Sequence, residues 1–136
     1  MARVSRVTTE LAELVAGKYL LLTTFRKDGR AVPTAVWFAE GDGADLVVWT
    51  VADSGKVKRI RRDGTVTITA CDVRGKPRGS AIAAQARLLD AADTQRTREL
   101  VAKRYGPLGR LTILGSRIRR GANGTVGIAI TPSETA

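Results

Sequence analysis

The sequence contains no histidine and only one cysteine among its 136 residues. Without histidine, the Ser-His-Asp and Cys-His nucleophile systems and every histidine-ligated metal site are excluded. The single cysteine, Cys71, can form neither an internal disulfide nor a zinc knuckle, so nothing indicates an oxidising compartment or a metal site. If the chain is an enzyme, a bound organic cofactor therefore carries the chemistry.

Aromatic residues make up 4% of the chain, and no apolar run reaches the roughly 20 residues that span a bilayer. The first six residues lack the apolar core of a signal peptide, so we expect a cytoplasmic protein with no membrane partner. So few aromatics also argue against an interleaved basic and aromatic surface for nucleic acid. We therefore expect no nucleic-acid partner.

Acidic residues are scarce beside basic ones: 13 Asp and Glu stand against 23 Lys and Arg, which gives a net charge of +10. Such an excess favours an anionic partner, whether nucleic acid, a membrane surface or a phosphorylated small molecule. The length suits one domain with a real core, and 43% hydrophobic with 26% charged residues is ordinary for a globular protein. We expect a single domain over residues 1–136.

Alternating apolar and polar residues, interrupted by turn signals, predict a mainly β chain. Asp28-Gly29 predicts a hairpin after the first strand, and Pro33 predicts an edge or a bulge in the second. Residues 111–118 are ambiguous between strand and helix. Six or so short strands with few helices predict a small antiparallel β-barrel. The strands are expected at residues 18–25, 30–40, 46–51, 65–73, 80–89 and 125–131.

Two further segments carry helix signals. Either threonine of residues 8–9 can cap a first helix that ends at Gly17. A second, longer helix is expected at residues 94–105, with Asp93 as its cap and Gly106-Pro107 as its end.

Residues 46–62 hold the most informative stretch, in which an apolar strand crosses a polar turn into a short basic helix. Val57 and Ile60 lie on one face of that helix, and Asp53 or Ser54 can cap it, leaving first-turn amides free to meet an anion. A phosphate cradle is one interpretation, and a solvated basic helix is the other. The cations of the helix are Lys56, Lys58, Arg59, Arg61 and Arg62.

Trp37 and Trp49 are the two tryptophans of the chain. Each can stack on an aromatic ligand, and core or interface packing is the equal alternative. Cys71 lies in a β-run and is expected to be a small core residue, since free cysteine is usually buried.

The order of these segments resembles the split-barrel flavin and deazaflavin oxidoreductases, which include pyridoxamine-phosphate oxidase and the actinobacterial F420-dependent reductases. The likeness to the reductases covers nearly the whole chain. It rests on residues 18–25, Val48-Trp49-Thr50, residues 56–61 and Gly124-Thr125-Val126-Gly127. This resemblance implies a mainly β, split antiparallel barrel of about six strands with two or three short helices. It also implies a homodimer that holds one cofactor per subunit in grooves at the dimer interface.

By position, the resemblance also implies a cofactor site. Trp49 and Thr50 match an aromatic-threonine pair beside the cofactor, Lys56 matches a phosphate-binding lysine, and residues 34–37 match the strand that lines the ring. No catalytic residue is identified, because Tyr19, Tyr105 or water can donate a proton. The residues assigned to cofactor binding are Thr34, Ala35, Val36, Trp37, Trp49, Thr50, Ser54, Gly55, Lys56, Lys58, Arg62 and Arg78.

The resemblance bears on the choice of cofactor too. Pyridoxamine-phosphate oxidases place cations where Thr34, Ala39 and Gly55 stand here. Their absence favours F420, whose phosphodiester and glutamate chain need a cationic track, over flavin mononucleotide (FMN), the alternative. The first hypothesis is an F420-dependent oxidoreductase that passes a hydride to or from a small organic acceptor. A non-catalytic carrier of F420, flavin or haem is the second, and a small basic barrel that binds nucleic acid is the third.

Overall fold

The computed structural model describes residues 14–41, 45–120 and 124–133, with the backbone alone for 108–120. Residues 14–16 are helical and end before Gly17, as predicted, while the predicted cap at residues 8–9 lies outside the described residues. The remaining elements are β1 (Tyr19–Phe25), β2 (Ala31–Val36), β3 (Phe38–Glu40), β4 (Leu46–Val51), α2 (Gly55–Arg62), β5 (Thr65–Cys71), β6 (Ile82–Leu88), α3 (Ala91–Arg120) and β7 (Thr125–Pro132).

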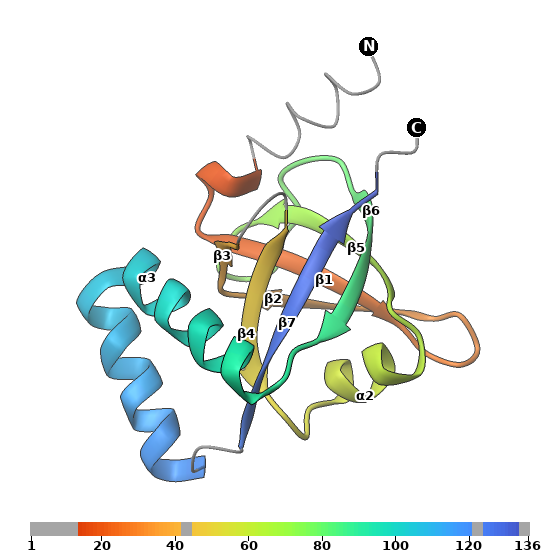
Figure 1. Cartoon of the computed structure of the whole chain (residues 1–136). Coiled ribbons are helices and arrows are strands. Elements are labelled where there is room, and N and C mark those ends of the chain that lie inside the picture. The colour runs from red at the N-terminus through yellow and green to blue at the C-terminus, as the bar shows by residue number, and fades with distance from the viewer. Residues whose placement is uncertain (1–13, 42–44, 121–123, 134–136) are drawn as a thin grey trace.

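All strands belong to one antiparallel sheet with the order β2-β1-β5-β6-β7-β4-β3. The two edge strands, β2 and β3, are consecutive in the chain and separated by Trp37 alone, so the sheet curls into a split barrel (Figure 1). The predicted fold class is confirmed. The strand predicted at 30–40 is divided, because its first part pairs with β1 and its second with β4. The division falls at Trp37. Pro33 lies on an edge strand, which is one of the two alternatives, an edge or a bulge, that the sequence predicts for it.

Side-chain alternation along the strands decides what fills the barrel. Leu20 and Leu22 of β1 point inward, opposite Ala70 and Ile68 of β5. This pattern follows the period-two alternation of the sequence. The fully buried apolar side chains of the interior are Leu14, Leu20, Leu22, Phe38, Val48, Val66, Ile68, Ile128 and Ile130.

Helix α2 contacts β1 and β6 at one end of the barrel (Figure 1). Val57 and Ile60, three residues apart, are buried at 0% and 5% exposure, as the sequence predicted. Ser54 occupies the N-cap position in an extended conformation, but its side chain makes no capping hydrogen bond. Ser54 is therefore at the predicted cap position, but its side chain does not cap the helix.

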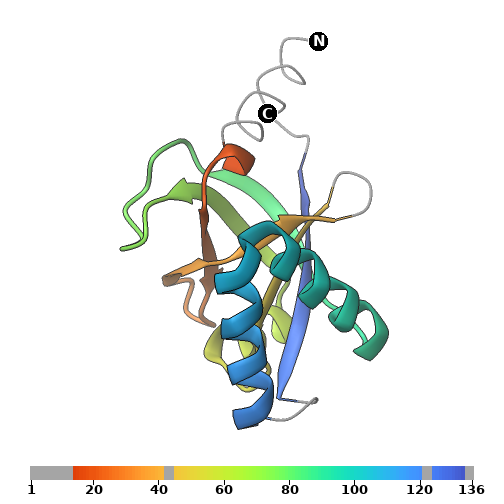
Figure 2. The ribbon, with the colours of Figure 1, turned by 90° about the vertical axis from the view of Figure 1, so that its left-hand side faces the viewer.

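Helix α3 differs from its prediction at both ends. Asp90, rather than Asp93, caps it, since the Asp90 carboxylate accepts a 2.8 Å hydrogen bond from the Asp93 N–H. The predicted end at Gly106-Pro107 is a kink, where Gly106 has φ +66°. Glycine tolerates that conformation and proline suits the first turn of the resumed helix, so the ambiguous residues 111–118 are helical. Figure 2 shows the two halves meeting at an angle.

The first half of α3 packs on the outer face of β3, β4 and β7. The approach to β7 is close, because a Cβ at Gly127 would lie 3.0 Å from Thr97 Oγ1. On the opposite outer face, Cys71 is buried as predicted, although it lies near Pro77 of the β5–β6 loop and not inside the barrel. In the described part of the chain, no helix is both long and apolar enough to cross a membrane.

Candidate functional site

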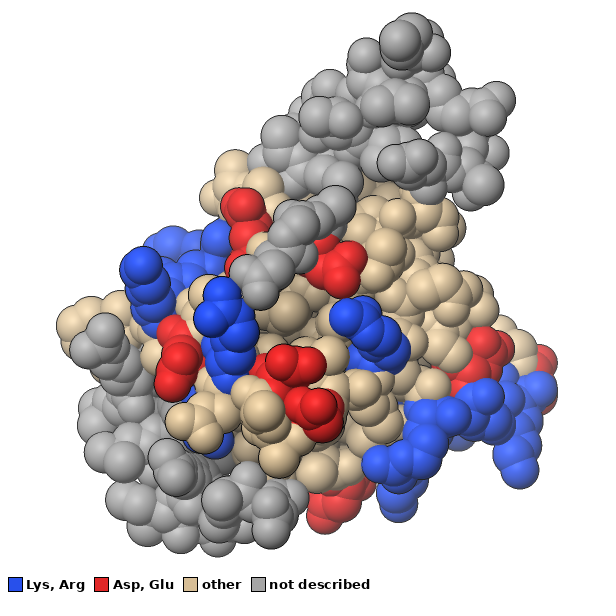
Figure 3. All heavy atoms as spheres, in the orientation of Figure 1, with Lys and Arg blue, Asp and Glu red and all other residues tan. Residues whose placement is uncertain are grey.

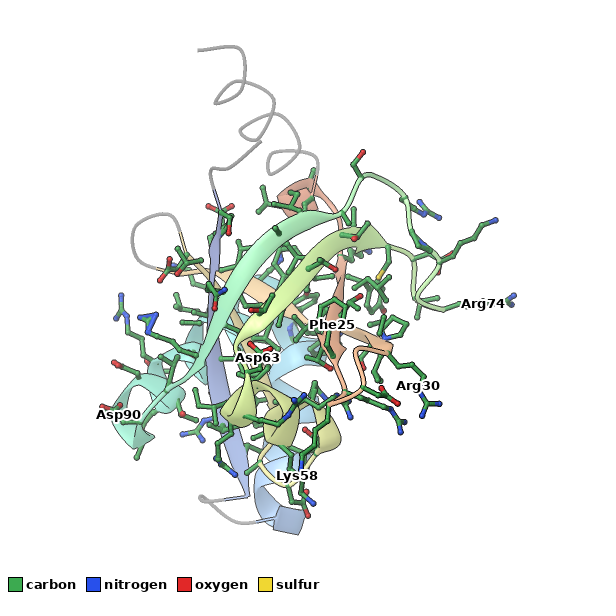
Figure 4. All side chains as sticks on the ribbon, turned by 90° about the vertical axis from the view of Figure 1, so that its right-hand side faces the viewer. Phe25, Arg30, Lys58, Asp63, Arg74 and Asp90 are labelled. Atoms are coloured by element: carbon green, nitrogen blue, oxygen red, sulfur yellow. The ribbon has the colours of Figure 1, made fainter. Side chains whose placement is uncertain are left out.

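A cleft of about 440 Å³ lies between the β1–β2 hairpin and helix α2. Figure 3 shows basic side chains gathered over these two elements, with acidic ones at the margin, and Figure 4 shows Lys58 pointing away from the barrel on this side. Five of its six lining residues are cations, and no carboxylate lines it. We call this site the basic cleft, defined by Arg26, Lys27, Gly55, Lys58, Arg59 and Arg62.

Two of the arginines are held in place by the end of β1. The Nε of Arg59 donates a 2.7 Å hydrogen bond to Oγ1 of Thr24, a buried hydroxyl. An Nη of Arg62 donates a 2.6 Å bond to the carbonyl oxygen of Phe25. Neither arginine bonds a carboxylate there, so each keeps its net charge available for a ligand. Their positions are fixed in advance, which lowers the entropy cost of binding.

Gly55 stands where the resemblance implies an arginine in flavin-binding relatives. A Cβ at this position would lie 2.8 Å from an Nη of Arg59, so the Arg59 guanidinium fills the space beside Gly55. Residues four apart are neighbours on a helix, which brings the charge of position 59 back to position 55. The interpretation that a cation is missing at Gly55 is therefore corrected, because Arg59, one helical turn later, supplies the positive charge at that place.

Lys56 is half-buried on α2 and lies close to Arg59. Burial, and then the positive charge of Arg59, lower the pKa of Lys56 below its ordinary value. No described cation of α2 forms an ion pair with a carboxylate. A bound anion would relieve both effects, because it would supply the missing opposite charge. Such perturbed groups are typical of functional sites.

Two buried polar atoms of the described residues have no hydrogen-bond partner: Oγ of Ser54, which directly precedes α2, and Nε1 of Trp49, which lies in the layer between β4 and α3. Leaving such an atom unsatisfied costs about 1–3 kcal/mol. Both belong to residues that the resemblance assigned to cofactor binding. A ligand in the basic cleft that offered a polar group to Ser54, the residue before Gly55, would satisfy one of these two atoms.

The predicted ring-lining residues 34–37 do not share one surface. Thr34 and Val36 stand opposite Leu22 and Leu20, so both point into the barrel. Ala35 points outward, close to Gly75 of the β5–β6 loop. The alternation of a strand separates these side chains between two faces.

Trp37 and Trp49 both pack on the layer between the barrel and α3. Trp37 stacks on Tyr105, with the ring centroids 4.4 Å apart and the planes 9° from parallel. Thr50 is half-buried and follows the inward-facing Val48 by two residues, so it belongs to the barrel side of β4.

Arg78 is not brought to the basic cleft within one chain. Its N–H donates to the carbonyl oxygen of Ala70, at the end of β5 that lies farther from α2. A strand of seven residues is about 20 Å long, at roughly 3.3 Å per residue. Figure 4 shows Arg74, in the same loop as Arg78, well away from Lys58.

Of the candidate proton donors, Tyr105 is engaged in structure. Its hydroxyl donates to the carbonyl oxygen of Lys18 at 2.6 Å and accepts from the N–H of Phe38 at 3.2 Å. Arg26 and Lys27 of the hairpin are the cleft residues that sequence reasoning missed, because they were interpreted only as part of a turn. Among the described residues, no group of three acidic or cysteine side chains could hold a metal ion.

Comparisons with known proteins agree with this architecture. The family model described as pyridoxamine 5'-phosphate oxidase matches residues 7–136. The comparison with curated proteins gives no match. Among solved structures, a putative pyridoxamine 5'-phosphate oxidase from Listeria innocua is 20% identical, with a TM-score of 0.63 over 93% of this chain and 92% of that one.

Two further structures are similar. A conserved hypothetical protein from Mycobacterium tuberculosis is 25% identical, with a TM-score of 0.67 over 91% of this chain and 79% of that one. HutZ from Vibrio cholerae, described as a heme storage protein, is 13% identical, with a TM-score of 0.62 over 96% of this chain and 91% of that one. At identities this low, the likeness to the Listeria and Vibrio proteins extends to the fold alone.

Proposed function

The chain belongs to the pyridoxamine 5'-phosphate oxidase family, and from this premise we propose that it is an F420-dependent oxidoreductase acting on a small organic acceptor. The observation that carries the proposal is the set of cations around Lys56 and Arg59, in a cleft that no carboxylate lines, together with the unpartnered Oγ of Ser54 at the start of α2. A ligand with an anionic tail and a polar ring would complement both features.

The residues of the chain have binding and positioning tasks in this proposal. Lys56 and Arg59 hold the phosphodiester, with Arg59 kept in place by Thr24. Trp49 is assigned to the cofactor by the resemblance alone, since its indole N–H is buried in the layer between β4 and α3. When bound, F420 supplies the hydride-transfer chemistry on its deazaflavin ring, so the protein needs no nucleophile of its own.

The surroundings of two other positions support F420 over FMN. Thr34 points into the barrel, and Ala39 is 3% exposed against Val101. A cation at position 39 would be buried without a partner, and one at position 34 would point toward the apolar interior of the barrel, both of which are costly. The available positive charge is therefore concentrated along α2 and the hairpin, where a ligand with a spread negative charge gains most.

A homodimer is part of the proposal. The outer face of β2, β1 and β5 carries no described helix (Figures 1 and 2), and it presents small or hydroxylated residues such as Pro33, Thr23 and Thr67. The β5–β6 loop covers this face at Leu21 and Ala35, and the rest of it suits a second copy of the chain. Sedimentation at micromolar concentration checks this point, and a monomer would contradict it.

A non-catalytic carrier is the second candidate, favoured by one observation: Tyr105, a candidate proton donor, has both hydrogen-bonding roles of its hydroxyl occupied. A haem carrier of the kind that HutZ is described to be would have to do without histidine, the commonest haem ligand. Oxidation of reduced F420 by a panel of quinone-like and unsaturated acceptors separates the enzyme from the carrier, which would bind without turnover.

The decisive experiment titrates the purified protein with F420 and with FMN and follows fluorescence. We expect a dissociation constant for F420 on the order of 1 μM or lower, and binding of FMN weaker by about tenfold or more. Binding of F420 should loosen with added salt, because the cleft is open to solvent and salt screens exposed charges. A protein that purifies yellow, holds FMN tightly and ignores F420 would overturn the assignment.

A further inference from the structure

We propose that Arg26 and Lys27 of the β1–β2 hairpin form a second cationic wall of the site, which selects ligands carrying several negative groups along a chain. This inference rests on the proposed function and names the part of the ligand that the cleft discriminates. It adds two residues that lie outside the stretch from which the site was predicted.

The basic cleft has two walls that come from separate parts of the chain. Arg26 and Lys27 lie on the hairpin, and Lys58, Arg59 and Arg62 lie on α2. The α2 wall is tied to the hairpin base by the Arg62 bond to the Phe25 carbonyl. The walls are therefore set relative to each other before a ligand arrives.

The hairpin itself is a defined turn. The Arg26 N–H donates to the carbonyl oxygen of Arg30 at 2.9 Å, and the Gly29 N–H donates to that of Arg26 at 2.9 Å. Gly29 has φ +89°, a conformation that glycine adopts without strain. Both cationic side chains therefore start from an ordered backbone.

Two acidic residues adjoin the cleft without lining it: Asp28, which also acts on the charge of Arg26, and Asp63, which acts on that of Arg62. Asp28 pairs with Arg30, at 2.9 Å between carboxylate and guanidinium, and also accepts the Arg30 N–H. Asp63, after α2, accepts the Thr65 N–H at 3.0 Å. The five cations of the cleft therefore surround a volume of about 440 Å³ that no carboxylate lines.

A single phosphate can approach only part of this surface. Once it is bound by the α2 cations, Arg26 and Lys27 on the facing wall have no ligand charge opposite them, and Asp28 beside Arg26 offsets only part of their charge. A chain of carboxylates or phosphates reaches both walls at once, and each added group binds at a high effective concentration. The geometry therefore favours an oligoanionic tail over one terminal phosphate.

The test compares three ligands: the bare deazaflavin without phosphate or tail, F420 with a short glutamate chain, and F420 with a long one. The proteins are the wild type, the double variant Arg26→Ala/Lys27→Ala, and the control Arg74→Ala/Lys76→Ala. The control removes the same two residue types from the exposed β5–β6 loop, away from the cleft. Thermal unfolding confirms that each variant folds.

We expect the wild type and the control to bind long-tailed F420 more tightly than short-tailed F420. The hairpin variant should lose that preference, with long-tail affinity falling about three- to tenfold, because solvent-exposed charge contacts are individually weak. Its affinity for the bare deazaflavin should not change. Tripolyphosphate should compete with long-tailed F420 on the wild type more strongly than inorganic phosphate does.

The outcomes separate this inference from the proposed function. If the wild type binds no deazaflavin in any form, the proposed function fails, and the inference fails with it. If the wild type prefers the long tail and the hairpin variant keeps that preference, the inference is overturned while the function stands. Competition by a short single-stranded oligonucleotide that outmatches long-tailed F420 would also overturn it, since the cleft would then be a nucleic-acid surface.

Discussion

The α3 side of the barrel and its α2 end differ in whether their polar groups find hydrogen-bond partners within the chain. On the α3 side, one Nη of Arg104 donates to the carbonyl oxygens of Val15 and Gly17, at 2.6 and 2.8 Å, and its guanidinium lies 4.4 Å from the Phe38 ring centre. The neighbouring Tyr105 uses its hydroxyl as donor and as acceptor. These groups are satisfied within the chain, and the exception on this side is Nε1 of Trp49, which is buried without a partner.

At the α2 end, the chain leaves polar groups without partners. Oγ of Ser54 is buried without a hydrogen bond, and Lys56 has only a like charge, that of Arg59, beside it. Folding alone does not explain this arrangement, because satisfying or removing these groups would stabilise the protein. The contrast indicates that the α3 side serves stability and the α2 end serves a ligand.

The largest expected effect belongs to the α3 side. Tyr105→Ala removes the stack on Trp37 and both hydroxyl bonds, so we expect the free energy of unfolding to fall by about 3 kcal/mol. Tyr105→Phe keeps the stack and should lose about 1–2 kcal/mol. Urea denaturation measures both. If Tyr105→Ala were as stable as the wild type, the α3 side would not have the role described.

Sequence patterns predicted most of the elements because strands and α2 have short-range periodicity. Val57 and Ile60 are an example: their spacing alone identified the buried face of α2. The division at Trp37 depends on the pairing of β3 with β4, which the local residues do not show. The continuation of α3 past Gly106 was missed because a Gly-Pro pair suits the end of a helix and the start of the next one equally well.

The sequence predicted the candidate site residues that lie next to one another on one element, but not those that two separate elements bring together. Ser54, Gly55 and Lys56 follow one another, so a motif could reveal them. Arg59 reaches Gly55 only through the geometry of a helical turn, and Arg26 reaches α2 only because β1 ends beside it. The fold determines which long side chains lie close together, and the local sequence does not show which ones they are.

The next effect concerns ligand affinity at the α2 end. Lys56→Ala should weaken F420 binding about ten- to a hundredfold with the fold intact, since a charged hydrogen bond to a phosphate contributes roughly 1.5–3 kcal/mol. Arg62→Ala should cost less, and Lys103→Ala, an exposed cation of α3, should cost nothing. Fluorescence titration measures all three. Equal small losses at positions 56 and 62 would make α2 a diffuse basic surface and not a cradle.

The smallest effect, in the opposite direction, concerns stability without ligand. Burial and Arg59 lower the pKa of Lys56, so the unfolded chain binds more protons than the folded one at pH values between the two pKa values. Lys56 therefore destabilises the fold at neutral pH, and that penalty is relieved as pH rises through the folded pKa. Lys56→Met keeps the length of the side chain without the charge.

The variant Lys56→Met should accordingly unfold at a slightly higher temperature than the wild type at pH 7, and this advantage should shrink in alkaline buffer. Lys103→Met on α3 is the matched control and should show no such pH dependence, since the Lys103 side chain is exposed to solvent. Calorimetry of both variants at pH 7 and in alkaline buffer measures the difference. A Lys56→Met protein that is less stable than the wild type at pH 7 would mean that Lys56 stabilises the fold, and the contrast between the two ends of the barrel would then fail at its central residue.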